Sequence, residues 1–147
     1  MPVTPTPIFA QTPYAVNGSL AAVTACTTRA PTVTASLAAA NISILVPAST
    51  NGLRSDQISV QACSSSFTAP TAAQTVLIWQ WDGTTAYVVD EFVVSVQTPS
   101  TTAAAFRASH SYTTFVLPAA FALYMSTSVT TTAATTALSV QVSGGLF

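Results

Sequence analysis

The sequence has very little charge. Asp, Glu, Lys and Arg make up 5% of the 147 residues, lysine is missing altogether, and the formal net charge is −1 at pH 7. Soluble domains usually carry about 25% charged residues. Arg29, Arg54 and Arg107 are scattered along the chain, and three such residues cannot supply the several phosphate contacts on which nucleic-acid affinity depends. We therefore expect no nucleic-acid partner.

Long apolar runs are also missing, although half of the residues are hydrophobic and the mean hydropathy is +0.54. A membrane-spanning helix needs about 20 apolar residues in a row. The densest apolar stretches, residues 76–79 and 119–125, are far shorter and are typical of buried strands. Residues 1–5 have neither the positive nor the apolar region of a secretion signal. We expect no membrane partner and synthesis in a cytoplasm.

Residues that could carry catalysis are few. General acid–base catalysis needs at least two titratable groups close together, and the candidates are Asp56, Asp82, Asp90, Glu91 and His110. Asp90 and Glu91 are adjacent in a predicted strand, so their side chains point to opposite faces unless a bulge intervenes. A lone histidine in a strand, such as His110, is more often a surface or hydrogen-bonded structural residue than a base. We expect no catalytic residue and no enzyme.

Metal and cofactor sites lack their sequence patterns as well. Cys26, Cys63 and one histidine do not have the spacing of a zinc site, and no glycine-rich phosphate loop is present. We therefore expect no metal and no cofactor. Without a secretion signal, two buried thiols are favoured over a disulfide between Cys26 and Cys63.

From residue 19 onward the sequence consists of short β-branched runs separated by Pro, Gly, Asn and Ser clusters. Residues 57–62 alternate polar and apolar side chains, as in a half-buried antiparallel strand. About eight to ten strands at intervals of 8–12 residues indicate an all-β fold, an antiparallel β-sandwich with jelly-roll or Greek-key connections, over residues 19–147. The expected strands are residues 42–46, 57–62, 76–81, 84–89, 92–96, 104–110, 114–117, 121–127 and 138–142.

The strongest local signal is a hairpin at Asp82 and Gly83. An Asp-Gly pair between two strand-like runs predicts a two-residue type I′ turn, because both positions tolerate positive φ. The resulting register pairs residue 81 with residue 84 and places Trp79 opposite Ala86. We assign Asp82 and Gly83 a structural role.

The same hairpin places Trp79 and Trp81 on one strand face. Two tryptophans on an exposed face could stack on a sugar. Burial in the core or at an interface is the reading we favour, because tryptophan contributes large apolar area at such places.

Residues 1–18 are expected to form an extended arm rather than a strand of the sandwich, since proline fixes φ and removes a hydrogen-bond donor. The arm contains Pro5, Pro7 and Pro13, together with the apolar side chains of Ile8 and Phe9. We interpret these five residues as an attachment interface, because the sandwich of the same chain need not bury them and a neighbouring subunit can.

Several stretches, taken in order, resemble a family of short tailed-phage proteins encoded among head and tail genes, some of which are capsid decoration (cement) proteins. The matching stretches are residues 6–13, 51–54, 58–60, 77–79, 82–83, 87–91, 98–100, 117–118 and 144–147. The resemblance implies a β-sandwich, in a small homo-oligomer (dimer or trimer), that binds the major capsid protein on the capsid exterior of the virion and braces the shell. It carries over no catalytic residue. The chain departs from the family in being nearly free of charge.

Two other functions remain open from the sequence. A tail or fibre component that binds a host surface would use the same kind of sandwich with exposed aromatic residues at one end. A carbohydrate-binding β-sandwich module would use Trp79 and Trp81 as its stacking platform.

Overall fold

The computed structural model describes residues 12–26, 32–34, 41–63, 70–133 and 136–147. In these ranges the chain forms nine strands and no helix, so the all-β prediction is confirmed. No helix among the described residues has the length and apolar character needed to cross a membrane. The strands are β1 (Thr12–Leu20), β2 (Thr32–Thr34), β3 (Ser43–Val46), β4 (Leu53–Ala62), β5 (Gln74–Trp81), β6 (Thr85–Val94), β7 (Arg107–Leu117), β8 (Ala122–Thr127) and β9 (Leu138–Leu146).

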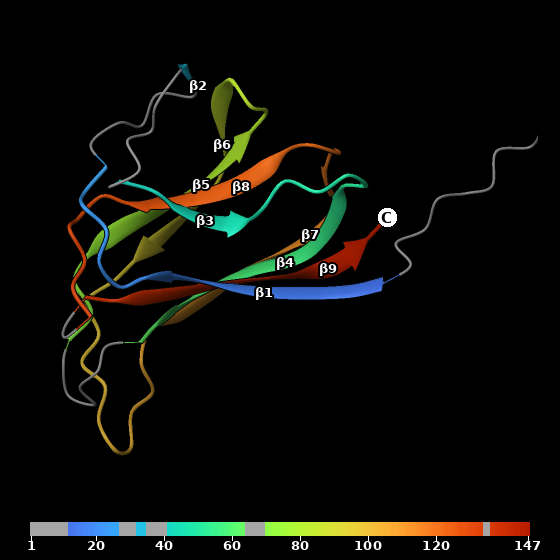
Figure 1. The fold of residues 1–147 in the computed structure, drawn as a ribbon. Coiled ribbons are helices and arrows are strands. Elements are labelled where there is room, and N and C mark those ends of the chain that lie inside the picture. Colours follow the sequence, from blue (N-terminus) through green and yellow to red (C-terminus); the bar gives the residue numbers. More distant parts are fainter. Residues whose placement is uncertain (1–11, 27–31, 35–40, 64–69, 134–135) are drawn as a thin grey trace, which may run out of the picture.

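The strands form two packed antiparallel sheets (Figure 1). One sheet has four strands in the order β1-β9-β4-β7, and the other has five in the order β2-β6-β5-β8-β3. The predicted β-sandwich is therefore confirmed.

The pairing shows which kind of sandwich this is. β5 and β6 form a hairpin, and outward from it β4 pairs with β7, β3 with β8, and β1 with β9. The chain is thus one long folded hairpin whose pairs of strands alternate between the two sheets, with β2 added at one edge. That arrangement is a jelly roll, one of the two connection patterns expected from the sequence.

The main core lies between the sheets, because alternate residues of each strand point inward. Ile58 and Val60 on β4 and Val140 and Val142 on β9 are fully buried there. They meet Val76, Ile78, Phe92, Leu123 and Met125 from the five-stranded sheet.

A second apolar cluster lies on the other side of β5. Leu77 and Trp79 alternate with Val76 and Ile78, so they point away from the main core, yet they too are buried. Cys26, from the segment after β1, packs against them. β5 is therefore apolar on both faces, which explains its continuous hydrophobic sequence.

The predicted arm is too long at its carboxyl end. Residues 12–18 belong to β1, which pairs with β9 from Thr12 opposite Leu146 to Leu20 opposite Leu138. Pro13 is accommodated because β1 is an edge strand, where a nitrogen without hydrogen can point away from the sheet. The other predicted arm residues, Pro5, Pro7, Ile8 and Phe9, lie outside the described residues.

The predicted hairpin exists, but its register is wrong. Trp81 pairs with Ala86 and Trp79 with Val88, and the backbone N–H of Asp82 donates to the carbonyl of Thr85 at 3.2 Å. The two turn residues are therefore 83 and 84, one position later than predicted.

The reason for this shift is the side chain of Asp82. Its Oδ1 accepts hydrogen bonds from the backbone N–H groups of Thr84 and Thr85 at 2.8 and 2.7 Å. These bonds fix Asp82 at the end of β5 and lower the pKa of its carboxyl group. Gly83 alone in the turn has positive φ, +97°.

The connections at the two ends of the sandwich differ in length. At one end lie the connections between β4 and β5, β6 and β7, and β8 and β9, of which the structure describes residues 63, 70–73, 95–106, 128–133 and 136–137. Backbone hydrogen bonds there link Cys63 to Ala137 and Thr71 to Gln97. At the other end the connections are residues 47–52, 82–84 and 118–121. The described residues of the connections at the first end include no charged residue, so that part of the surface is neutral.

Candidate functional site

The outer side of the four-stranded sheet is a broad surface without charge at its centre. Residues that alternate with the core positions point outward, and the strand register aligns them in rows across the sheet. Most are serine, asparagine or glutamine. We call this surface the neutral face; it consists of Ala15, Asn17, Ser19, Gln57, Ser59, Gln61, Ser109, Ser111, Ser139, Gln141 and Ser143.

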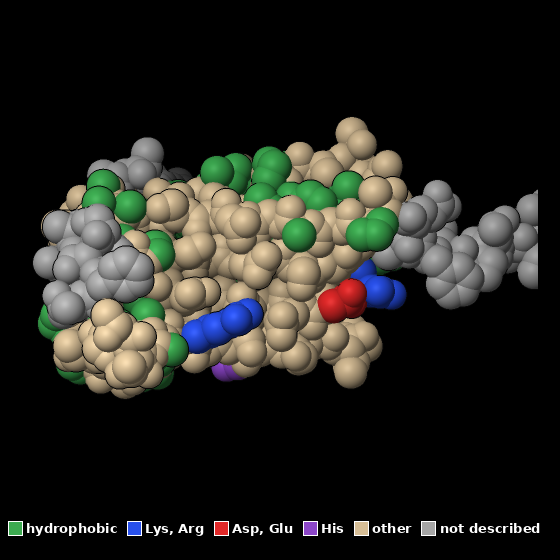
Figure 2. Space-filling model, turned by 90° about the horizontal axis from the view of Figure 1, so that it is seen from below, with side chains coloured by type: hydrophobic (Ala, Val, Ile, Leu, Met, Phe, Trp, Pro, Cys, Tyr) green, Lys and Arg blue, Asp and Glu red, His purple; other side chains and the backbone are tan. Residues whose placement is uncertain are grey.

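Charged residues flank this face only near its ends. Arg54 and Asp56 form a bidentate ion pair, with Nε–Oδ1 and Nη2–Oδ2 distances of 2.9 and 3.2 Å. Arg107 follows at the other end, opposite Gln61. Figure 2 shows an acidic and a basic side chain side by side near one end of this face and a second basic side chain well apart from them, on a surface of other side chains and backbone. Because Arg54 and Asp56 neutralise each other, the face has little field with which to attract or repel a charged partner.

Because most side chains of this face are short, little side-chain entropy is lost when a partner docks on it. Serine and alanine lose little rotamer freedom when they are fixed, and glutamine loses more. Seven of the eleven residues are serine or alanine. The face therefore has hydrogen-bonding capacity, a low entropy cost of docking and no charge to desolvate.

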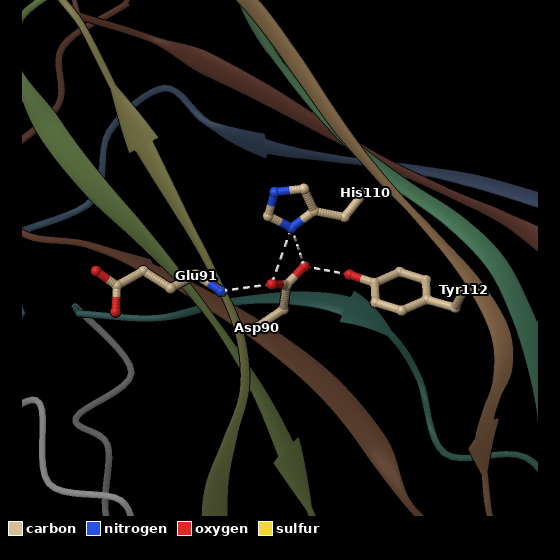
Figure 3. Close-up of polar contacts among 4 residues, drawn as sticks. All are labelled: Asp90, Glu91, His110 and Tyr112. Carbon is tan, nitrogen blue, oxygen red and sulfur yellow. Dashed lines mark hydrogen bonds and ion pairs between the residues drawn. The ribbon is translucent and has the colours of Figure 1, made fainter.

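A separate polar cluster joins the two sheets at the β6/β7 edge. Asp90 pairs with Ile78, but Trp79 pairs with Val88, so β6 has one extra residue, Val89. This bulge turns Asp90 toward the side of Ile78, where it faces His110 and Tyr112 of β7 (Figure 3). We call these three residues the Asp90 cluster.

The Asp90 carboxylate is the centre of that cluster. Its oxygens lie 3.0 and 2.9 Å from Nδ1 of His110, and it accepts hydrogen bonds from the hydroxyl of Tyr112 and, at 2.8 Å, from the backbone N–H of Glu91. The His110 ring stacks on Phe92 with a centroid distance of 4.2 Å. Burial, followed by the hydrogen bond and charge of Asp90, raises the pKa of Tyr112, so its hydroxyl stays protonated as a donor.

The chemistry open to this cluster is limited by what surrounds it. A carboxylate that orients a histidine is half of a nucleophile-activating arrangement. Among the described residues, however, His110 contacts Asp90 and Phe92, and the neighbouring Ser109 and Ser111 lie on the opposite face of β7. The described residues also contain no group of three or more His, Cys, Asp or Glu side chains placed to hold a metal. The contacts of Asp90 with His110 and Tyr112 link the two sheets through polar side chains.

From the sequence, Trp79 and Trp81 could be either buried or exposed on one strand face. Trp79 is 0% exposed and donates its indole N–H to the hydroxyl of Ser126 at 2.8 Å. Trp81 is partly buried in the same second apolar cluster. A fully buried Trp79 cannot stack on a sugar, so the pair does not form a binding platform.

The two cysteines lie in different environments. Cys26 is buried in the second apolar cluster, whereas Cys63 is exposed, and no disulfide joins the two. Partial burial raises the pKa of the Cys63 thiol. The expectation of two thiols without a disulfide is confirmed, but the expectation that both are buried is wrong for Cys63, which directly follows β4.

The sequence missed the Asp90 cluster. His110 and Tyr112 follow Asp90 by 20 and 22 residues. From the sequence we predicted only that the adjacent residues Asp90 and Glu91 point to opposite faces and share no site. The bulge at Val89 decides where Asp90 points, and no residue in the sequence marks it. Comparison of the chain with family models, curated proteins and solved structures found no match.

Proposed function

We propose that this protein is a decoration protein, which binds the major capsid protein on the outside of a phage head and stabilises the shell. The observation that carries the proposal is the neutral face. It is broad and has no central charge, so it suits a large protein surface better than a small ligand or a polyanion.

The architecture is compatible with this role. Jelly rolls occur in viral capsid proteins and in lectins, among other proteins, and the fold alone does not select between them. The sequence resemblance to phage head proteins favours the first. In this proposal the neutral face rests on the shell, and the segment containing Pro5, Pro7, Ile8 and Phe9 serves as the attachment arm.

The first experiment measures co-sedimentation with purified heads that lack the protein. Replacing Gln57 and Gln141 together by glutamate keeps the size of both side chains and adds two charges to the neutral face, at positions that lie opposite serines and not opposite Arg107. We expect at least a tenfold loss of head binding, because each carboxylate would have to be desolvated at the interface. The matched control is Asn51→Asp, which adds a charge in the 47–52 connection and should bind as the natural chain does.

The second experiment tests the arm. Deletion of residues 2–11 leaves β1 intact, and we expect an unchanged β circular-dichroism spectrum with loss of head binding. Undiminished binding by the glutamate variant would refute the neutral face as the contact, and undiminished binding by the deletion variant would refute the arm. If the natural chain fails to bind any head, the decoration role itself is wrong.

A second candidate is a tail or fibre component that binds a host surface. The observation that favours it is the collection of long connections, with exposed Val96 among them, at one end of the sandwich. Protein abundance in purified particles distinguishes the two roles, since a decoration protein should approach the shell protein in amount and a tail component should be a minor band. The carbohydrate-binding alternative loses its main support because Trp79 is buried.

A further inference from the structure

The two long sides of the sandwich end in strands of very different character. On one side lie β7 and the part of β6 beyond Tyr87, where the pairing with β2 ends. Both strands contain irregularities, the bulge at Val89 and a shift in which residues 112–114 oppose Asp56. The charged or polar side chains of Asp90 and His110 lie between them. Bulges and inward-pointing charged residues are the devices by which natural sheets prevent edge-to-edge pairing.

The opposite side has few of these protections. β1 and β3 lie against each other there, and neither contains a charged residue. Ala15 is exposed, Tyr14 and Val16 are half-buried, and Ile44 is 49% exposed. Figure 2 shows hydrophobic side chains gathered along one long side of the molecule.

Pro13 determines which backbone groups of β1 face outward. Its nitrogen carries no hydrogen, so it must be one of the positions that point away from β9. Orientation alternates along a strand, so the N–H and C=O groups of Ala15, Asn17 and Ser19 also point away from β9. These three residues offer a hydrogen-bonding edge that begins just after the proline.

We propose that two copies of this chain associate through β1, antiparallel, about a two-fold axis at Asn17. In this register Asn17 faces Asn17 of the second copy, and Ala15 faces Ser19. Pro13 lies beyond the paired residues, so it limits the ladder without costing a bond. The two four-stranded sheets become continuous, and so do their neutral faces.

A second copy is the occupant that the edge fits best. A two-fold axis places the residues close to it near their own counterparts, so a charged residue there would face a like charge. β1 has none, and its outward N–H and C=O groups are complementary to themselves in the antiparallel sense. The biological role of this dimer rests on the proposed function. The dimer itself is a property of the isolated protein and is tested without phage heads.

The first test is sedimentation of the purified full chain. We expect a dimer of twice 15.0 kDa that dissociates on dilution. Asn17→Lys puts two ammonium groups opposite each other at the axis and should weaken the dimer at least tenfold, with an unchanged circular-dichroism spectrum. Ser109→Lys, the matched control on the exposed outer side of edge strand β7, should leave the dimer intact. A natural chain that is monomeric at all concentrations, or a dimer insensitive to Asn17→Lys, overturns the proposal.

The second test is a disulfide across the axis. Directly opposite, hydrogen-bonded residues have Cα atoms about 5.5 Å apart, within the range that a disulfide spans. With Cys63→Ser as background, Asn17→Cys should give a covalent dimer on mild oxidation, and Ser109→Cys should not. Equal cross-linking of both variants would show random collision and refute the register. A dimer that forms but does not bind heads would refute the decoration role while leaving the pairing standing.

Discussion

The two sheets differ in what lies on their outer sides. The five-stranded sheet carries Leu77 and Trp79 there, and they are covered by a second apolar cluster. The four-stranded sheet carries the neutral face, whose side chains are mostly in contact with solvent. Both sheets share the main core, so the difference arises from the alternate residues alone. One outer side contributes to stability, and the other is available for a partner.

The largest effect should come from removing the centre of the covered side. Trp79→Ala leaves a cavity where a fully buried ring stood, and we expect a loss of about 3–5 kcal/mol in the free energy of unfolding. Urea denaturation followed by circular dichroism measures this. Gln141→Ala on the neutral face should change the same quantity by less than about 0.5 kcal/mol. Similar losses for both variants would contradict the distinction between the two sides.

A smaller effect is expected from the polar group buried on the covered side. Ser126→Ala removes the acceptor of the Trp79 indole N–H and should cost about 1–3 kcal/mol, because the donor stays buried without a partner. The matched substitution Ser109→Ala on the neutral face should cost little. Equal stabilities of the two variants in urea would mean that Ser126 is reached by water.

The turn that joins the two central strands of the covered side should matter less. Gly83 has φ of +97°, and an added Cβ would meet no atom within 4 Å. Gly83→Ala should therefore cost only the backbone strain, about 1–2 kcal/mol. By contrast, a Cβ on Gly144 of β9 would overlap the backbone carbonyl of Arg54. Thermal melts should rank Gly144→Ala well below Gly83→Ala, and the reverse order would contradict the packing of β9 on β4.

The smallest effect concerns pH and the edge between the sheets. The raised pKa of Tyr112 means that an unfolded tyrosine ionises near pH 10 while the native one does not. The contribution of the protonated Tyr112 hydroxyl to the free energy of unfolding is therefore present below about pH 10 and is lost as the pH rises further. We expect a loss of about 0.5–1 kcal/mol by pH 11, allowing for solvent screening. Tyr112→Phe should flatten this decline in urea titrations at pH 8 and pH 11, and an unchanged slope would contradict the burial of the hydroxyl.

Much of the fold follows from patterns that operate along the chain. Alternation and turn residues locate most strands, because side-chain direction in a strand depends only on position. The same alternation predicts that Trp79 and Ile78 lie on opposite faces. It does not reveal that both faces of β5 are covered, since that depends on the segment containing Cys26, which is distant in sequence.

Bulges account for what the sequence could not show. Residues 84–89 and 92–96 were predicted as separate strands, but residues 85–94 form the single strand β6. Residues 104–110 and 114–117 were also predicted as two strands, but residues 107–117 form the single strand β7. An extra residue leaves no mark in composition, yet it reverses every later side chain. The Asp90 cluster depends on one such residue, so it could be found only from the pairing of β6 with β5.

The pairing of β1 with β9 has a consequence for how the chain is made. β1 leaves the ribosome more than a hundred residues before its partner β9. At a synthesis rate of about 5–20 residues per second, β1 waits on the order of ten seconds for β9. During that interval Tyr14, Val16 and Leu20 have no sheet to cover them. The high separation of paired strands also predicts folding in milliseconds to seconds rather than microseconds.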